Sequence, residues 1–252
     1  MKNTLRQVAV IITTLITLTV NGLANALPLN GLGTGEISDR FEIYFVPAGY
    51  VFSIWGLIYL GLLAFTVYQA LPAQREDARL VKIGWAVVIA NLANATWIFF
   101  WHYLLFPLSL LAMATLLAAL LFIYTGLEIG KSIATALERW LVRVPFSVYL
   151  GWITVATIAN TADVLDYIQW GQFGISDETW MFIILFVVVA IGWAMSIFRK
   201  DLAYLAVLLW ALAGIGVKFP DSGVVTTSIW VSFGLVASAF GWAAVPQKAP
   251  PA

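Results

Sequence analysis

Eight apolar runs of about twenty residues divide the sequence, and each is long enough to cross a bilayer as an α-helix. The composition agrees: 62% of the 252 residues are hydrophobic and only 10% are charged, whereas a soluble domain carries about 25% charged residues. We therefore predict an all-α fold, a polytopic membrane helical bundle with eight transmembrane helices. The predicted spans are 8–27, 46–70, 80–103, 105–129, 144–168, 180–198, 202–219 and 224–245.

The first apolar run has two readings. Lys2 and Arg6 precede it, and it ends in Ala24-Asn25-Ala26, which resembles the cleavage site of a signal peptide. The run is longer than the usual core of a signal peptide. We therefore expect a retained transmembrane helix, with a cleaved signal as the alternative.

Lysine and arginine are divided unevenly between the two sides of the predicted membrane. Eleven lie on the side of the N-terminus, and only Arg40 and Lys218 lie on the other. Because basic residues concentrate in cytoplasmic loops, we expect an inner-membrane protein with both termini in the cytoplasm. A seven-span chain would break this partition, which favours eight spans. The eleven residues are Lys2, Arg6, Arg75, Arg79, Lys82, Lys131, Arg139, Arg143, Arg199, Lys200 and Lys248.

Composition also excludes several kinds of chemistry. The net charge is zero, so no basic surface suggests a nucleic-acid partner. The chain has no Cys, which excludes disulfides and thiolate chemistry. With a single histidine we expect no metal site, and we expect His102 to be an interfacial residue at a helix end. Twelve Trp residues are more than interfacial belts require.

One polar stripe runs along the predicted helix 144–168. Its residues fall within roughly 80° of arc at 100° per residue, and lipid would reject an amide or a carboxylate there. The stripe must therefore face other helices or a cavity. The span 80–103 carries a similar face, on which each Asn could simply bond a neighbouring helix. The two faces are Pro145, Tyr149, Trp152, Ala156, Asn160 and Asp163, and Asn91, Asn94, Trp97 and Trp101.

Two of the loops between predicted helices contain hydrophobic residues as well as polar ones. The loop 28–45 is Gly-rich at first and then amphipathic through Phe41 and Phe45. It is either a solvated linker or a lid that lays its aromatic residues over the outer mouth of the bundle. The segment 130–143 is mixed in charge, and we expect a short interfacial helix there.

Three segments together resemble the tryptophan-rich sensory protein family, also called TspO or translocator protein. Residues 47–52 (PAGYVF) followed by Trp55 and Tyr59 look like the family motif of the second helix. Asn94-Ala95-Thr96-Trp97 matches the motif of the third helix, and Trp152, Ala156 and Asn160 match the four-residue spacing of the fifth. Trp55 follows Phe52 by three residues where the family has four, and the last three spans have no counterpart in the five-helix core.

This resemblance implies a domain division and a site. Residues 1–168 would form the TspO-like five-helix membrane domain, and 169–252 three additional transmembrane helices with a short tail. The family binds porphyrins, haem precursors or sterols in an aromatic-lined pocket that opens toward the first loop. Trp and Tyr rings offer flat apolar faces to such a ligand, and amides can orient its polar edge. The implied pocket residues are Trp55, Tyr59, Asn94, Trp97, Trp101, Trp152 and Asn160.

The expected function is a membrane receptor, sensor or carrier for a hydrophobic planar ligand, with a tetrapyrrole as candidate and no covalent cofactor. We expect a lipid bilayer around the protein, no nucleic acid, and a homodimer as a candidate assembly. A small-molecule transporter and a structural or accessory subunit of a larger membrane complex are the alternatives. An enzyme is a further alternative, in which Asp163 and Trp152 would support oxidative or photochemical turnover of a porphyrin, as proposed for relatives.

Overall fold

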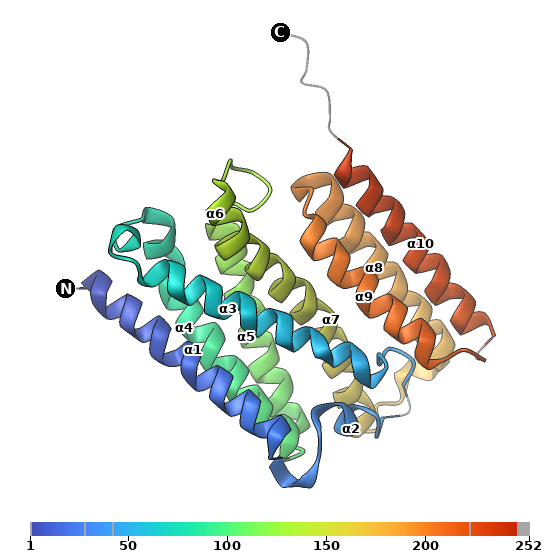
Figure 1. Ribbon diagram of the computed structural model, residues 1–252. Coiled ribbons are helices and arrows are strands. Elements are labelled where there is room, and N and C mark those ends of the chain that lie inside the picture. The colour runs from blue at the N-terminus through green and yellow to red at the C-terminus, as the bar shows by residue number, and fades with distance from the viewer. Residues whose placement is uncertain (1, 28, 42, 222, 246–252) are drawn as a thin grey trace.

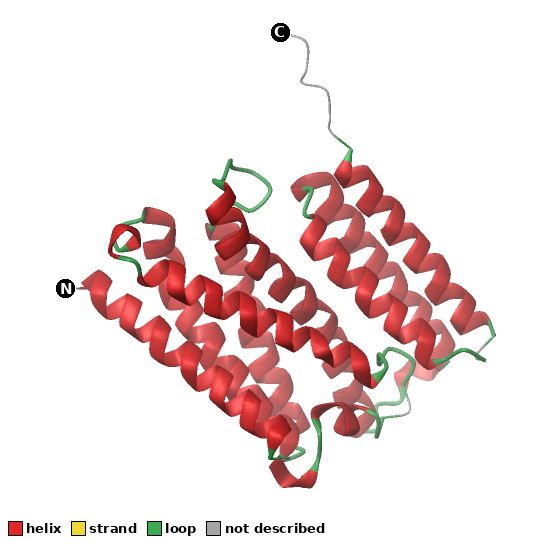
Figure 2. Cartoon of the chain, viewed as in Figure 1, coloured by secondary structure: helices red, strands yellow, loops and turns green. Residues whose placement is uncertain are grey.

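The computed structural model describes residues 2–27, 29–41, 43–221 and 223–245. Throughout these ranges the chain forms helices joined by turns and loops, without strands (Figure 2). The all-α prediction is therefore confirmed, and the bundle is polytopic. Eight long helices carry the fold. They are α1 Lys2–Ala26, α3 Ile54–Ala70, α4 Ala78–His102, α5 Phe106–Gly126, α7 Val144–Tyr167, α8 Asp177–Arg199, α9 Leu202–Lys218 and α10 Val224–Ala244.

Seven helical segments within the described ranges are long and apolar enough to cross a membrane. One of them joins the 3₁₀ turn η2 (Gly49–Ser53) to α3, and another joins the short α6 (Ala136–Glu138) to α7 through the π-helical turn η4 (Arg139–Arg143). The eighth long helix, α9, is apolar but has 17 residues, at the short end of the range for a span. It lies beside α8 and α10 in Figure 1. The count of eight spans stays a prediction.

Polar caps start α4 and α8 earlier than hydropathy indicates. The Asp77 carboxylate accepts hydrogen bonds from the backbone N–H groups of Arg79 and Leu80, both at 3.0 Å, so α4 begins at Ala78. Ser176 caps α8 in the same way. Such side chains satisfy N–H groups that the helix itself leaves unpaired. Because Ala48 is the N-cap of η2, Pro47 lies outside the helix rather than in its first turn.

Five helices close into a ring. α4 packs between α1 and α5, α7 packs between α5 and α3, and α3 returns to α1 (Figure 1). The remaining three helices attach through α9, which packs along α7, while α10 packs against both α8 and α9. The residues of the faces predicted on 80–103 and 144–168 are buried, except for Ala156, which is partly buried.

The two groups of helices are joined by a buried carboxylate. Asp201 accepts hydrogen bonds from Tyr124 Oη at 2.8 Å and from Ser147 Oγ at 2.6 Å, and it also caps the start of α9 at Tyr204 N. Gly130 lies against the same region with φ of +76°, and a Cβ there would lie 2.0 Å from the carbonyl oxygen of Arg199. Only glycine fits that position.

A polar seam ties α1 to α4 inside the ring. Thr17 Oγ1 donates to the carbonyl oxygen of Asn91 at 2.8 Å, and Asn91 Nδ2 donates to the hydroxyls of Thr13 and Thr14 at 3.2 and 3.0 Å. These groups are buried. Asn91 therefore bonds a neighbouring helix, as intramembrane Asn residues often do.

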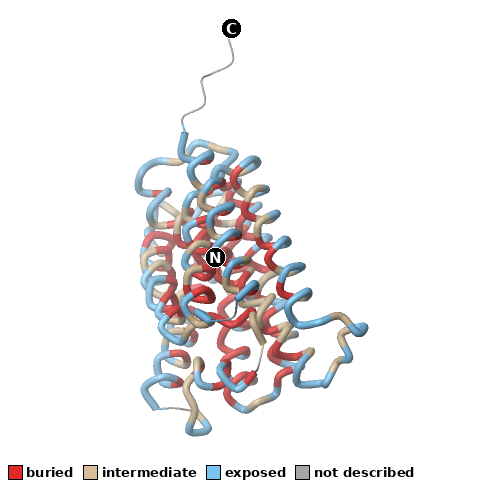
Figure 3. The backbone as a smooth tube through the Cα atoms, turned by 90° about the vertical axis from the view of Figure 1, so that its right-hand side faces the viewer, coloured by how far each residue is buried: buried red, intermediate tan, exposed pale blue. Residues whose placement is uncertain are grey.

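The outside of the bundle is apolar. Large side chains such as Leu60, Val67, Leu111 and Phe186 are exposed, whereas the buried residues gather in the middle (Figure 3). A soluble monomer rarely exposes extensive apolar surface, and a bilayer would cover it. The chain is a membrane protein on this ground as well as on hydropathy.

The basic residues collect at one end of the bundle. The N-terminus and the α3–α4, α5–α6 and α8–α9 connections lie at this end, which we call the basic end (Figure 1). Ten of the eleven residues assigned to the cytoplasm belong to it, and Lys248 lies outside the described residues. The expected short helix in 130–143 is the turn α6 with η4, continuous with α7. That the basic end faces the cytoplasm stays a prediction.

Candidate functional site

Loop 1 is the connection 28–45, and its described residues, 29–41 and 43–45, fold over the other end of the ring. It contains the 3₁₀ turn η1 (Leu29–Gly31) and the helix α2 (Thr34–Ser38), and Thr34, Ile37 and Ser38 are buried. Phe41 and Phe45 are buried as well. The Phe41 ring meets Phe106 edge-on at 4.9 Å and lies 6.4 Å from Trp101. The structure therefore has the lid arrangement, not the solvated linker.

The end of α4 holds this lid in place. His102 Nε2 lies 3.0 Å from Thr34 Oγ1, and Trp101 Nε1 donates to the carbonyl oxygen of Thr34 at 3.1 Å. His102 Nδ1 lies 3.2 Å from the carbonyl oxygen of Leu29. His102 is fully buried, so the expectation of an interfacial histidine is wrong. The cause is loop 1, whose polar groups cover the imidazole.

Aromatic side chains stack on one another inside the five-helix bundle. Trp55 stacks on Tyr59 at 5.6 Å and on Trp97 at 6.0 Å, and Trp97 stacks on Trp101 at 5.7 Å. Trp152 meets Trp55 edge-on at 6.2 Å. The rings come from α3, α4 and α7, so the two faces predicted on 80–103 and 144–168 meet the aromatic residues of the 46–70 motif at one place.

A small cavity lies within this cluster beneath loop 1, and we call it the inner cavity. Five of the seven predicted pocket residues line it, which are Trp55, Trp97, Trp101, Trp152 and Asn160. Phe52, Met113, Asp163 and Ser38 are among the other lining residues. Its volume is about 30 Å³, which is space for one or two water molecules.

The polar groups around the inner cavity are only partly satisfied. Asn160 Oδ1 accepts from Trp97 Nε1 at 3.3 Å, and Asn160 Nδ2 donates to Ser109 Oγ at 3.0 Å. Trp152 Nε1 and Asp163 Oδ1 are buried and have no hydrogen-bond partner among the described residues. Buried polar atoms are nearly always paired, so one donor and one acceptor here are available to a ligand.

Asp163 is one of the lining residues that the sequence-based set of pocket residues omits. It lies on the same stripe as Trp152 and Asn160, at the spacing that brings it to the same cavity. A carboxylate so near a helix end is usually exposed to solvent. The structure buries it instead, because loop 1 covers that end.

Asn94 and Tyr59 do not line the inner cavity. Asn94 Nδ2 donates to Tyr149 Oη at 2.8 Å, and Asn94 Oδ1 accepts from Asn21 Nδ2 at 2.8 Å. Both ends of the amide are thus bonded within the bundle. Contact of Asn94 with a ligand stays a prediction. Tyr59 lines a separate hollow.

We call that hollow the side cavity. It lies between α1, α3 and loop 1, has a volume of about 680 Å³, and includes Asn21, Gly22, Glu36 and Tyr59 in its lining. Phe52 and Trp55 line both the side cavity and the inner cavity, so their rings form the wall between the two.

These features define the class of the protein as a polytopic helical membrane protein with an aromatic internal site covered by its first loop. A family model described as TSPO-like protein matches residues 7–242, and the chain belongs to this family. The match runs into α10, so it includes the three C-terminal helices that the sequence motifs left out. No curated protein and no solved structure matched the chain.

Proposed function

We propose that the protein is a membrane receptor or carrier for a hydrophobic, planar, tetrapyrrole-like ligand held by Trp55, Trp97 and Trp152. The observation that supports this most is the aromatic stack around a cavity in which Trp152 Nε1 and Asp163 Oδ1 lack partners. Flat rings give a planar ligand apolar contact, and the two unpaired atoms give its polar groups one donor and one acceptor. Within a TSPO-like membrane protein we assign this site to binding rather than to catalysis.

The size of the inner cavity makes the described arrangement a closed form. Pockets for drug-sized ligands have volumes of about 300 to 1,000 Å³, far above the 30 Å³ of the inner cavity. The side cavity has the required volume and is separated from the inner cavity by Phe52 and Trp55. Rotation of these two rings would join the cavities, and displacement of loop 1 would open the inner cavity directly.

Trp152 and Asp163 would set the preferred polar groups of the ligand. Trp152 Nε1 can donate to a ligand carboxylate or carbonyl, and Asp163 can accept from a ligand N–H. An unpaired buried acceptor costs about 1 to 3 kcal/mol, which a ligand N–H would relieve. Tetrapyrroles carry both pyrrole N–H groups and peripheral carboxylates, which suits this pair.

Tryptophan fluorescence tests the proposal. Protoporphyrin IX titrated into the detergent-solubilised protein should quench wild type more deeply than the variant Trp55→Phe, Trp97→Phe, Trp152→Phe. The matched control replaces Trp85, Trp140 and Trp242, three exposed rings outside the cluster, with Phe.

Both triple variants lose three tryptophan fluorophores. A difference between them therefore reports where the replaced tryptophans lie and not how many remain. The control should keep the wild-type dissociation constant, and the cavity variant should bind at least about tenfold more weakly. Asp163→Leu keeps a side chain of similar length but removes the acceptor, and it should also weaken binding, which guards against a folding defect in the triple variant. Equal dissociation constants in all four proteins would overturn the proposal.

A further inference from the structure

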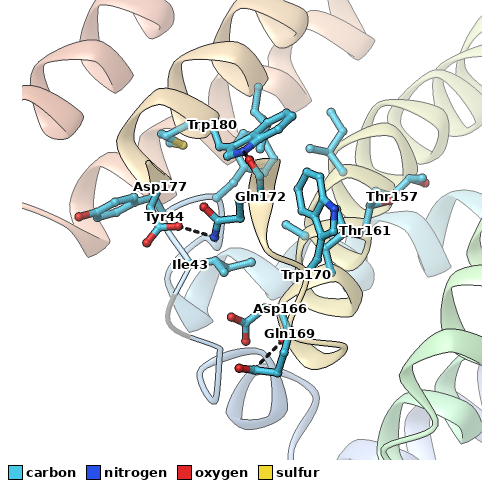
Figure 4. Close-up of a pocket in the computed structure, with 16 residues that line it drawn as sticks. Ile43, Tyr44, Thr157, Thr161, Asp166, Gln169, Trp170, Gln172, Asp177 and Trp180 are labelled. Atoms are coloured by element: carbon cyan, nitrogen blue, oxygen red, sulfur yellow. Dashed lines mark hydrogen bonds between the residues drawn. The ribbon is translucent and has the colours of Figure 1, made fainter. Parts of the chain in front are cut away.

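A third cavity lies outside the aromatic cluster, on the opposite face of α7. It has a volume of about 540 Å³ and is formed by the second half of α7, the first turns of α8 and the end of loop 1 (Figure 4). We call it the α7–α8 cavity. α8 packs mainly against α10 and α9, so the space beside α7 is left open. Its volume falls in the range of small-molecule sites.

The walls that α7 and α8 give this cavity are apolar. Thr157 Oγ1 donates to the carbonyl oxygen of Ile153 at 2.6 Å, and Thr161 Oγ1 donates to that of Thr157 at 2.7 Å. Both hydroxyls are thus occupied by their own helix. Ile158, Ala162 and Leu165 on α7, with Met181 and Ile184 on α8, complete these walls. The body of an occupant must therefore be hydrophobic.

One end of the cavity is aromatic and held in place. The rings of Trp170 and Trp180 lie 5.2 Å apart at an interplanar angle of 55°. Trp180 Nε1 donates to the carbonyl oxygen of Gln172 at 3.1 Å, and Gln172 Nε2 donates to Asp177 Oδ1 at 2.7 Å (Figure 4). This bonding links the Trp180 ring and the Asp177 carboxylate through Gln172.

The charged residues that line the α7–α8 cavity are all acidic. Asp166 and Asp177 line the cavity, and none of the lining residues is Lys, Arg or His. The nearby Lys218 pairs with Asp39. Carboxylates with aromatic faces favour cations, and aromatic rings recognise quaternary ammonium groups in particular. An anionic ligand would meet only repulsion here.

We propose that the α7–α8 cavity binds an amphiphilic organic cation, with its ammonium group near Trp170, Trp180 and the two carboxylates and its apolar body between α7 and α8. The same chemistry could come from a soluble amine or from a lipid headgroup that carries a trimethylammonium group. The site does not depend on the inner cavity, since α7 separates the two.

The test uses two probes with one tail and heads of opposite charge, 4-phenylbutyltrimethylammonium and 4-phenylbutanesulfonate. Each is titrated calorimetrically into the full chain in an uncharged maltoside detergent. The ammonium probe should bind, and the sulfonate should bind at least about tenfold more weakly. Equal binding of the two probes would overturn the proposal.

Variants separate the cavity from a general surface charge. The double variant Asp166→Asn, Asp177→Asn should weaken the ammonium probe about five- to tenfold. The control Glu178→Gln removes a carboxylate next to Asp177 that does not line the cavity, and it should change the affinity less than about twofold. An equal loss of affinity in the double variant and in the control would assign the effect to surface charge and refute the proposal.

A variant that fills the α7–α8 cavity gives an independent test of the site. Ala162→Phe fills the apolar wall without changing charge and should abolish binding of the probe while the melting temperature holds. Unchanged affinity in this variant would place the probe elsewhere and refute the site. Phosphatidylcholine added to the micelles then identifies the source of the cation. Competition indicates a lipid headgroup, and lack of competition indicates a soluble amine.

Discussion

Removal of the Phe41 ring should open the lid over the inner cavity. Phe41 is buried in the closed form, where it packs against Phe106 and Trp101, and it would be returned to water when loop 1 lifts. Burial of a Phe side chain contributes about 1.5 to 3 kcal/mol. Phe41→Ala should therefore raise the population of the open form roughly 10- to 150-fold.

The association rate of a porphyrin reports this change. If the ligand enters only when loop 1 lifts, the rate should rise by the same factor until opening no longer limits it. Stopped-flow quenching of tryptophan fluorescence by protoporphyrin IX measures the rate. Phe198→Ala removes an equal ring from the exposed surface at the basic end and should leave the rate unchanged.

A second readout needs no ligand. The chain has no Cys, so Ile37→Cys introduces a single thiol within the lid itself, at a position in α2 that is fully buried in the closed form. Its labelling by a maleimide should accelerate when Phe41→Ala is added. If labelling accelerates and the association rate stays the same, loop 1 is mobile but is not the gate, and the reasoning fails.

Three further predictions concern topology, the site and the joint between the helix groups. Fusion reporters placed after Arg75 and after Lys248 should both report the cytoplasm, and disagreement between them would mean that the span count is wrong. Asn160→Leu should lower both the melting temperature, by loss of its bonds to Trp97 and Ser109, and porphyrin affinity, by roughly five- to 150-fold; a lower melting temperature with unchanged affinity would assign Asn160 to packing alone. Asp201→Ala leaves two buried hydroxyls and a helix end without their acceptor and should destabilise the protein by about 2 to 4 kcal/mol in thermal unfolding, whereas an equal effect in the exposed control Asp221→Ala would contradict the joint.

The long helices could be predicted because the bilayer imposes both their length and their composition. The span predicted as 144–168 is observed as Val144–Tyr167, and 224–245 as Val224–Ala244. The errors of three residues or more fall at helix ends such as Gly126, where 129 was predicted, and at starts such as Gly49 and Asp177. α8 begins at Asp177 rather than at residue 180, since acidic residues favour a helix N-terminus that a hydropathy pattern excludes.

The candidate site was predictable only where it depends on helical periodicity. The spacing of Trp152, Asn160 and Asp163 brings them to one face, and that face lines the inner cavity. Periodicity gives the direction of a side chain but not its partner, so it could not show that Tyr149 and Asn21 occupy Asn94. The burial of His102 depends on Thr34, which lies 68 residues away, and no local pattern contains that contact.

An experimental structure of the protein in nanodiscs, prepared with and without protoporphyrin IX, would test the central claim most directly. We expect the porphyrin ring in contact with Trp55, Trp97 and Trp152, a polar group of the ligand at Asp163 or Trp152 Nε1, and loop 1 or the Trp55 ring displaced from the closed form. A porphyrin bound on the lipid-facing surface or between α7 and α8, with the inner cavity unchanged, would contradict the account.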